Sequence, residues 1–330
     1  MSMKNVDVKD MANKVEQAYK RISPHIHKTP LLHSLALSKQ TGAHVYLKLE
    51  NEQKAGSFKV RGAFNKLMTC IESDDGTTKG YVTASTGNHG MASALAFSTL
   101  KQQGMVFVPE TVADTKERTL RLYDVKLEKY GTDCVETEKR ARSHAEANGL
   151  VFISPYADMD VIFGQGTIGK EVIAELPNLD AMFITVGGGG LIAGVAGFLK
   201  AYNTAIEVVG CLPKNSPVMH ESVKAGCIVD FESLETLSDA SAYGIEDGSP
   251  TVGLCSALVD TWVTVSEEEI STGMNEMLET HHKVVEGSAG VALAAFRKTA
   301  ERYRGKRVAV LICGANVSMS NLNLVLQQNK

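Results

Sequence analysis

The sequence lacks the features that direct a protein to nucleic acid, to a membrane or out of the cell. It has no long run of Lys or Arg, and its formal net charge of −4 provides no electrostatic footprint for a polyanion. Residues 1–20 are polar and amphipathic, without the apolar stretch of a secretory signal. We therefore expect a cytoplasmic protein that binds neither nucleic acid nor membrane.

Cysteine is sparse and widely spaced. The six residues are Cys70, Cys134, Cys211, Cys227, Cys255 and Cys313. They form no C-x-x-C pair, and no nearby histidine lies at the spacing of a zinc site. The pattern is typical of reduced thiols in a cytosolic protein, and we predict no metal site.

What remains is the composition of an ordinary globular protein of the α/β class. Apolar residues make up 44% and charged residues 22% of the sequence, close to the averages for soluble globular proteins. A length of 330 residues is enough for two domains or one large unit. Buried strand-like runs alternate with helical segments, the pattern of parallel sheets with crossover helices. A period of 3.6 predicts a helix at residues 8–22, and Ser266 with Glu269 forms a capping box. The predicted strands are residues 45–49, 81–84, 105–108, 182–186, 206–209, 262–265 and 308–312.

Four consecutive glycines stand between an apolar strand and an apolar helix. They are Gly187, Gly188, Gly189 and Gly190, followed by Leu191. Glycine lets backbone N–H groups converge on an anion, and the N-terminus of the next helix adds partial positive charge. We interpret this segment as a phosphate-binding loop, because a tight turn needs only one or two glycines.

The same segment leaves a second class of protein open. Gly188, Gly190 and Ala193 satisfy the G-x-G-x-x-A pattern of a nicotinamide oxidoreductase. That interpretation requires an acidic residue at the end of the next strand, whereas Glu207 lies at its start. A non-catalytic protein that has kept only the phosphate loop is a third class.

A reactive lysine is predicted in the segment 54–63. Ser57 is a plausible N-cap, which places Lys59 in the first turn of a helix. There the positive end of the helix dipole lowers the pKa of the amine, as Schiff-base chemistry requires. Taken alone, a lysine at such a position is more often a solvated surface residue.

Two further segments follow strands. Residues 84–90 carry the hydroxyls of Ser85 and Thr86, the amide of Asn88 and the imidazole of His89, beside the start of a helix. Such donors can bind the carboxylate of an amino acid, although a lone histidine more often makes a structural hydrogen bond. Cys313 ends the last predicted strand, where a core thiol is the commoner role.

Together these segments resemble the fold-type II pyridoxal-phosphate enzymes, specifically the threonine/serine dehydratase (ammonia-lyase) and serine racemase group. The resemblance runs from about residue 29 to residue 316 and includes secondary motifs at residues 28–32, 47–50, 164–167 and 286–290. It implies a fold like that of the tryptophan synthase β subunit, with two open, twisted, mostly parallel sheets flanked by helices. It also implies a large domain of residues 1–79 and 155–330, a small mobile domain of residues 80–154, and a site in the cleft between them.

The resemblance assigns roles to the residues singled out above. Lys59 holds pyridoxal 5′-phosphate as a Schiff base and then takes the Cα proton, and Phe58 packs on the pyridine ring. The loop from Gly187 to Leu191 binds the phosphate. Cys313 meets the pyridine nitrogen, and Asn88 contacts the phenolic oxygen as well as substrate. The expected substrate-binding residues are Ser85, Thr86, Asn88 and His89.

The implied activity is β-elimination of a small β-hydroxy amino acid, such as L-threonine or L-serine, to a 2-oxo acid and ammonia. A neutral thiol at Cys313 makes the ring a weaker electron sink than a carboxylate would, which favours loss of a β-hydroxyl over transamination. A catabolic role is expected, because the chain stops at Lys330 without room for a C-terminal regulatory domain. We also expect a homodimer or homotetramer.

Four positions depart from the family's pattern. Ala55 replaces a threonine, residues 238–241 replace an A-D-G turn, and Leu212 stands where metal-binding members have a glutamate. Thr86 lies where racemases carry a serine base. A racemase therefore stays open, as does a lyase for 3-hydroxyaspartate, phenylserine or a hydroxyectoine breakdown product.

Overall fold

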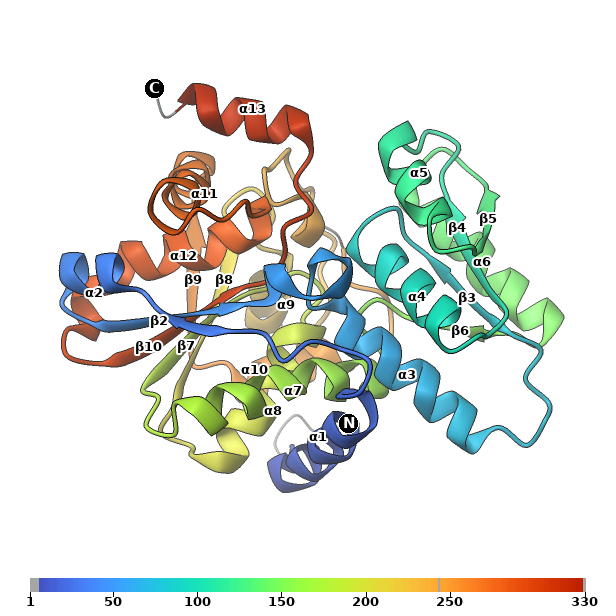
Figure 1. Ribbon diagram of the computed structural model, residues 1–330, viewed down its shortest axis with the longest axis horizontal. Coiled ribbons are helices and arrows are strands. Elements are labelled where there is room, and N and C mark those ends of the chain that lie inside the picture. Colours follow the sequence, from blue (N-terminus) through green and yellow to red (C-terminus); the bar gives the residue numbers. More distant parts are fainter. Residues whose placement is uncertain (1–5, 243, 329–330) are drawn as a thin grey trace.

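The computed structural model describes residues 6–242 and 244–328 and contains two sheets (Figure 1). The larger sheet has six strands, of which only the edge strand β1 runs antiparallel to its neighbour. In spatial order its strands are β1 (Leu31–His33), β2 (His44–Leu49), β10 (Arg307–Ile312), β7 (Ala181–Thr185), β8 (Glu207–Pro213) and β9 (Thr261–Val265).

The smaller sheet has four parallel strands, all drawn from one stretch of the chain. Their order is β5 (Lys126–Lys129), β4 (Gly104–Val108), β3 (Tyr81–Ala84) and β6 (Val151–Phe152). The two sheets with their helices lie side by side, which confirms the predicted α/β class of two mostly parallel sheets (Figure 1).

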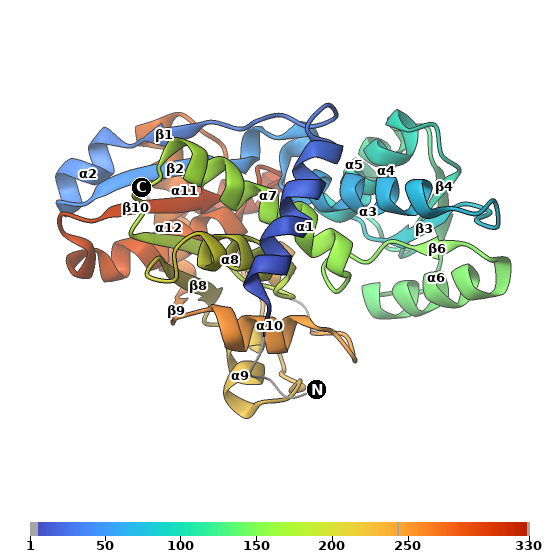
Figure 2. The same ribbon diagram turned by 90° about the horizontal axis from the view of Figure 1, so that it is seen from below.

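Helices cover both faces of each sheet. On one face of the larger sheet α1 (Val8–Ile22), α7 (Met159–Glu175) and α8 (Gly190–Tyr202) pack together, and α11 (Glu267–His281) pairs with α12 (Gly287–Thr299) on the other (Figures 1 and 2). The smaller sheet lies between α6 (Cys134–Asn148) on one side and α4 (Asn88–Thr99), itself packed on α3 (Lys59–Ser73), on the other. The remaining helices are α2 (Leu35–Thr41), α5 (Asp114–Arg121), α9 (Val218–Ala225), α10 (Thr251–Leu258), α13 (Met319–Gln328) and the 3₁₀ turns η1 (Glu50–Glu52), η2 (Lys54–Gly56), η3 (Asp239–Ser241) and η4 (Ala300–Tyr303).

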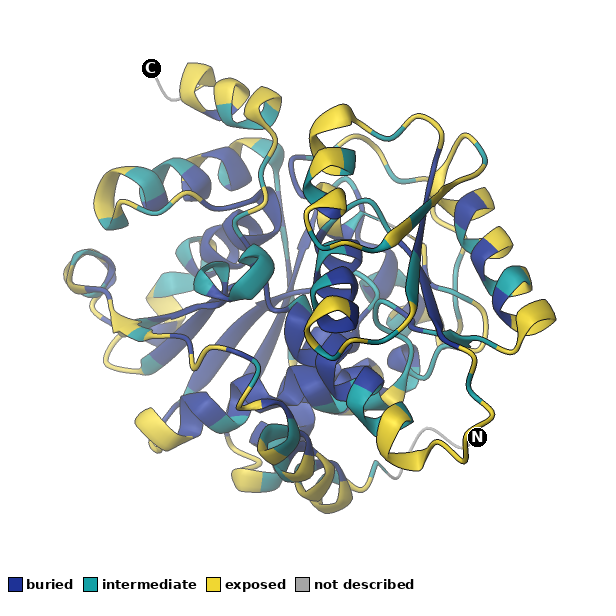
Figure 3. Ribbon diagram, turned by 45° about the vertical axis from the view of Figure 1, so that its right-hand side comes forward, coloured by how far each residue is buried: buried dark blue, intermediate teal, exposed yellow. Residues whose placement is uncertain are grey.

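Burial explains why the strands read as continuous apolar runs. All residues of β3 and β7 and nearly all of β10 are buried, because helices cover both faces of these strands (Figure 3). None of the described helices is both long and apolar enough to span a bilayer.

The predicted elements agree with the structure at several positions. The helix at residues 8–22 is α1, and Ser266 and Glu269 form both hydrogen bonds of the capping box. The strand predicted at residues 206–209 is longer, because Gly210 continues it. A Cβ atom at Gly210 would lie 2.7 Å from the Trp262 ring, so this glycine is required by packing and does not end the strand.

The predicted N-cap of α3 is wrong. Ser57 has an extended backbone and pairs with Gly314 in an isolated β-bridge, and Phe58 takes the cap position without a side-chain hydrogen bond. Tertiary pairing has overridden the local preference of serine for capping. Lys59 is nevertheless the first residue of α3 and so lies in the first turn of a helix, as predicted.

A cluster of four buried charges fixes the start of α3. Arg61 donates to Glu50 from Nε at 2.8 Å and from Nη2 at 2.7 Å, and to Glu171 from Nη1 at 2.8 Å. Lys48 Nζ donates to Glu171 Oε2 at 2.6 Å and to the Thr29 carbonyl at 2.7 Å. Each of the four charged side chains is at most 1% exposed. Their charges sum to zero, and they join β2, η1, α3 and α7.

We predict that Glu171→Ala lowers the free energy of unfolding by about 3–5 kcal/mol, because it leaves Arg61 and Lys48 buried with one carboxylate between them. Glu175→Ala is the matched control, since Glu175 lies one turn further along α7 and pairs with the exposed Lys28. That pair is worth about 1 kcal/mol or less. Urea unfolding would measure both, and equal losses would contradict the role given to the cluster.

Candidate active site

Lys59 lies between the two sheets at the start of α3. Its Nζ donates to the carbonyl of Pro155 at 2.8 Å and lies 5.3 Å from the centroid of the Phe58 ring. The Phe58 N–H donates to the Cys313 carbonyl at 3.2 Å, which ties the segment before α3 to the end of β10. Lys59 is thus held between the exit of β6 and the exit of β10.

The Lys59 environment favours a neutral amine. Burial lowers the pKa of Lys59 to about 8, against a weaker opposing effect of the nearby Glu286 and Cys313. On the order of a tenth of the amine is therefore unprotonated at pH 7, far more than for an ordinary lysine with a pKa of about 10.4, and a nucleophilic lysine requires this neutral form.

The glycine loop follows β7 and leads into α8. Gly189 has φ +86, a left-handed conformation that side chains disfavour. A Cβ atom at Gly188 would lie 2.6 Å from the Tyr156 ring, and one at Gly190 would lie 2.5 Å from the Tyr156 carbonyl. These close approaches exclude side chains, so the loop exposes only backbone beside the N-terminus of α8, as an anion site requires. Leu191 continues α8 and is buried.

Asn88 begins α4 and contacts a carboxylate that sequence reasoning did not single out. Its Nδ2 donates to Glu286 Oε1 at 3.0 Å and Oε2 at 2.9 Å, and its Oδ1 accepts from Asn316 Nδ2 at 2.6 Å. Cys313 Sγ lies 3.9 Å from Glu286 Oε1. Burial raises the pKa of Glu286 to about 7, and burial also raises the pKa of Cys313 well above its usual value. The thiol therefore stays neutral, with a titratable carboxyl group beside it.

His89 lies behind this group of residues. Its Nε2 is 3.0 Å from the Ile153 carbonyl, and burial, followed by the charge of Lys59, lowers the pKa of His89 to about 3. The imidazole is therefore neutral, and the contact with Ile153 is the structural hydrogen bond that a lone histidine usually makes. Ser85 and Thr86 form the turn between β3 and α4 and are partly exposed, and the Gly87 N–H donates to Ser85 Oγ at 3.2 Å.

The structure therefore brings most of the predicted site residues together. Asn88 and Cys313 contact Glu286, and the charge of Glu286 acts on the amine of Lys59. The glycine loop follows β7, the strand next to β10. Sequence reasoning gave no role to Glu286, Pro155 or Tyr156. Glu286 belongs to the motif at residues 286–290, but it is almost 200 residues from Asn88 in the sequence, so the contact between them could not be predicted. Leu212 is buried in β8, and the described residues contain no group of three or more metal-ligating side chains.

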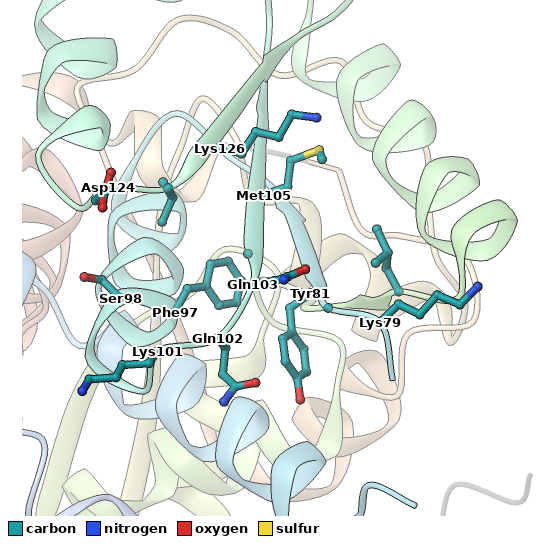
Figure 4. A pocket seen from close by; sticks show the side chains of 14 residues that line it. Lys79, Tyr81, Phe97, Ser98, Lys101, Gln102, Gln103, Met105, Asp124 and Lys126 are labelled. Atoms are coloured by element: carbon teal, nitrogen blue, oxygen red, sulfur yellow. The ribbon is translucent and has the colours of Figure 1, made fainter. Parts of the chain in front are cut away.

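Another cavity is unrelated to this arrangement. It has a volume of about 530 Å³ and lies at the amino ends of the small-sheet strands, opposite the ends that lead to Ser85 and Pro155. Figure 4 shows that the amines of Lys79, Lys101 and Lys126 at its edge point in different directions.

The residues present fit an anionic cofactor. Two buried hydroxyls beside the site residues, Ser57 Oγ and Ser288 Oγ, have no hydrogen-bond partner among the described residues, and neither does His89 Nδ1. The glycine loop excludes side chains, and the amine of Lys59 has a lowered pKa. Fold and site together are those of an α/β protein with a lysine of lowered pKa between its two sheets and a glycine loop that can bind an anion.

Comparison with known proteins identifies the family. Residues 22–314 match the family described as "Pyridoxal-phosphate dependent enzyme", and the chain belongs to it, so pyridoxal phosphate is its cofactor. It is a fold-type II member of the threonine dehydratase and serine racemase group.

Relatives within this group are similar over nearly the whole chain. The "L-threonine dehydratase catabolic TdcB" of Staphylococcus aureus is 35% identical, over 95% of this chain and 91% of that protein. The "L-threonine ammonia-lyase" of Thermotoga maritima is 34% identical, over 95% and 77%. Among solved structures, threonine deaminase isoform 2 of Solanum lycopersicum has a TM-score of 0.92 at 30% identity, covering 99% and 95%. Maize serine racemase has a TM-score of 0.87 at 29% identity, covering 96% and 97%.

We predict that Lys59→Ala abolishes the visible absorbance of pyridoxal phosphate bound through a lysine and lowers turnover by about 10³-fold or more, because the variant lacks the amine expected to bind the cofactor and to act as base. Lys54→Ala is the control, since Lys54 lies in η2 and its Nζ donates to the His25 carbonyl. Circular dichroism would verify folding. Cofactor absorbance and turnover that persist in the Lys59 variant would refute the assignment.

A second prediction concerns the charge of Glu286. In cofactor-free protein the Lys59 amine should react with an amine reagent with a midpoint near pH 8, its pKa being lowered to about 8. Because ionised Glu286 raises this pKa, Glu286→Gln should move the midpoint to lower pH. Mass spectrometry of modified peptides across pH measures the midpoint, and a shift to higher pH would contradict the electrostatic argument.

Proposed function

We propose that this protein catalyses the pyridoxal-phosphate-dependent β-elimination of a small β-hydroxy amino acid, such as L-threonine or L-serine, to a 2-oxo acid and ammonia. The observation that carries the proposal is the Lys59 amine, with its lowered pKa, beside the Asn88 and Glu286 pair. The relatives named as L-threonine dehydratase and L-threonine ammonia-lyase, at 35% and 34% identity, support it.

The chain's residues would hold the cofactor at several points. Backbone N–H groups from Gly187 to Leu191 would bind its phosphate, and the Phe58 ring would pack on its pyridine ring. Cys313 would face the ring nitrogen, and Asn88 the phenolic oxygen. Bound pyridoxal phosphate draws electron density from the substrate Cα, so that the Cα proton and the β-substituent can leave.

Lys59 is the base in this proposal. With the cofactor bound, Lys59 Nζ would accept the Cα proton as a neutral amine. The proton held on Lys59 Nζ would then pass to the β-hydroxyl, which would leave as water. The released enamine tautomerises to an imine, which water hydrolyses to the 2-oxo acid and ammonia.

The turn before α4 binds and orients the substrate. Ser85, Thr86 and Asn88 present hydroxyl and amide donors at the N-terminus of α4, where partial positive charge favours a carboxylate. His89 stays neutral because its pKa is lowered to about 3. It would therefore help to orient the substrate-binding turn through hydrogen bonds, without adding charge. Closure of a small mobile domain, residues 80–154, over the large one would exclude water from the site.

Racemization is a second candidate that one residue favours. Thr86 keeps a hydroxyl where racemases place a serine base, and maize and Dictyostelium serine racemases have TM-scores of 0.87 and 0.86 to this chain. Threonine is stiff at χ1, and its extra methyl must be accommodated where the hydroxyl would turn toward Cα. Return of the proton on the face opposite Lys59 should therefore be slow relative to loss of the β-hydroxyl.

A cytoplasmic location stays a prediction from the sequence. A homodimer or homotetramer also stays a prediction, as does independence from added divalent metal, which rests on Leu212. Size-exclusion chromatography would test the assembly, and assays in chelator would test the independence from metal.

Ammonia release from a panel of β-hydroxy amino acids tests the proposed function directly. The panel contains L-threonine, L-serine, 3-hydroxyaspartate and phenylserine, with Lys59→Ala as the inactive control. We expect release of ammonia in equal amount to the 2-oxo acid from at least one of the first two. No release from any member of the panel would refute the proposal.

The balance of reactions provides a further prediction. With L-serine, pyruvate should form much faster than D-serine, and Thr86→Ser should raise the D-serine share by about threefold or more, because the β-methyl is removed. Chiral chromatography beside a pyruvate assay measures both products. D-serine formed as fast as pyruvate by the unmodified enzyme would contradict the preference for elimination.

A further inference from the structure

Glu246 has no role in the proposed reaction, but it contacts residues that pack against the glycine loop at residues 187–190. It lies between η3 and α10, in the part of the chain that belongs to the larger sheet. Its carboxylate accepts hydrogen bonds from Arg142 of α6, which covers the smaller sheet, and from Ser154 Oγ at 3.1 Å. The carboxylate therefore connects the two halves of the molecule.

The Glu246 backbone makes a second connection. Its N–H donates to the hydroxyl oxygen of Tyr156 at 2.7 Å. The Tyr156 ring and carbonyl are the atoms that approach Gly188 and Gly190 in the phosphate loop, and the Pro155 carbonyl accepts from Lys59. Residues 154–156 thus touch Glu246, the phosphate loop and the reactive lysine.

Arg142 is well placed to hold this carboxylate. Its guanidinium lies 4.0 Å from the centroid of the Phe152 ring in β6, and its second carboxylate partner is Glu138, one turn earlier on α6, at 2.8 Å. The side chains of Arg142 and Glu246 are 40% and 22% exposed, so the ion pair is partly shielded from solvent. Stacking on Phe152 restricts the guanidinium and lowers the entropy cost of the pair.

We propose that Glu246 is a positioning residue for the cofactor. With Arg142 and Ser154 it holds residues 154–156 against the phosphate loop and keeps the Pro155 carbonyl at Lys59. Loss of the Glu246 carboxylate would leave the Tyr156 ring free to move away from the glycines and would weaken binding of the cofactor phosphate. The inference rests on the proposed phosphate-binding role of residues 187–191 and not on the proposed reaction, because cofactor retention is measured without substrate.

Three variants separate the parts of this arrangement. Glu246→Gln keeps a hydrogen-bonding side chain but removes the charge that pairs with Arg142. Tyr156→Phe keeps the ring against Gly188 but removes the hydroxyl that accepts from the Glu246 N–H. The double variant Arg142→Glu with Glu246→Arg restores an ion pair of reversed sign. Arg121→Gln is the matched control, because Arg121 makes the same kind of helical pair with Glu117 on α5, outside this contact.

The primary measurement is the rate at which bound pyridoxal phosphate is lost after dilution, followed by visible absorbance. We expect Glu246→Gln and Tyr156→Phe each to accelerate loss about fivefold, the factor that corresponds to about 1 kcal/mol. The charge-reversed double variant should recover part of the wild-type rate, and Arg121→Gln should match wild type. Hydrogen exchange of residues 187–191 in cofactor-free protein should be faster in the first two variants.

The outcomes are decisive in both directions. Wild-type cofactor loss in both Glu246→Gln and Tyr156→Phe would overturn the proposal. Faster loss in Glu246→Gln without recovery in the double variant would overturn the part assigned to the Arg142 ion pair. Absence of ammonia release from every amino acid, with normal cofactor loss rates, would count against the proposed function and leave this test intact.

Discussion

The buried guanidinium of Arg61 is the constraint on which the site depends. A fully buried cation is tolerated only when carboxylates in fixed geometry compensate for its lost hydration, and here Glu50 and Glu171 do so. One partner follows β2 and the other lies on α7, so the first turn of α3 has a single position relative to both. Lys59 is two residues before Arg61, and that position places its amine at Pro155. Such a cluster need not add net stability over an apolar core, but it gives α3 one register.

A second set of polar residues, near the Lys59 amine, connects the two halves of the molecule. Asn88 comes from the smaller sheet's first helix, whereas Glu286 and Asn316 come from the larger unit. Burial keeps the pKa of Glu286 near 7, and the thiol of Cys313 neutral beside it. The electrostatic surroundings of a ring nitrogen at Cys313 would therefore depend on the protonation of a neighbouring carboxyl group as well as on the thiol. The sequence argument from a neutral thiol alone omitted this group.

Similarity of fold does not separate the reactions within the family. Threonine deaminase and serine racemase structures both superpose on this chain with TM-scores above 0.8. What distinguishes the reactions is local, namely the groups that can reach each face of the substrate Cα. In the proposed mechanism Lys59 would serve one face, and Thr86 would be the residue that separates the two candidate activities on the other.

The sequence by itself determined the α/β class, helix α1, the capping box of α11 and the segments that carry the lysine and the glycine loop. These features are local: apolar periodicity and glycine runs depend on residues close in the chain. The role of Ser57 could not be predicted, because its pairing with Gly314 crosses more than 250 residues and overrides its capping preference. The same holds for Glu286, Tyr156 and Glu246, whose partners are distant in sequence. Only the tertiary structure decided these contacts, since burial and long-range hydrogen bonds, which set the pKa values of Lys59 and Glu286, exist only once both sheets have packed together.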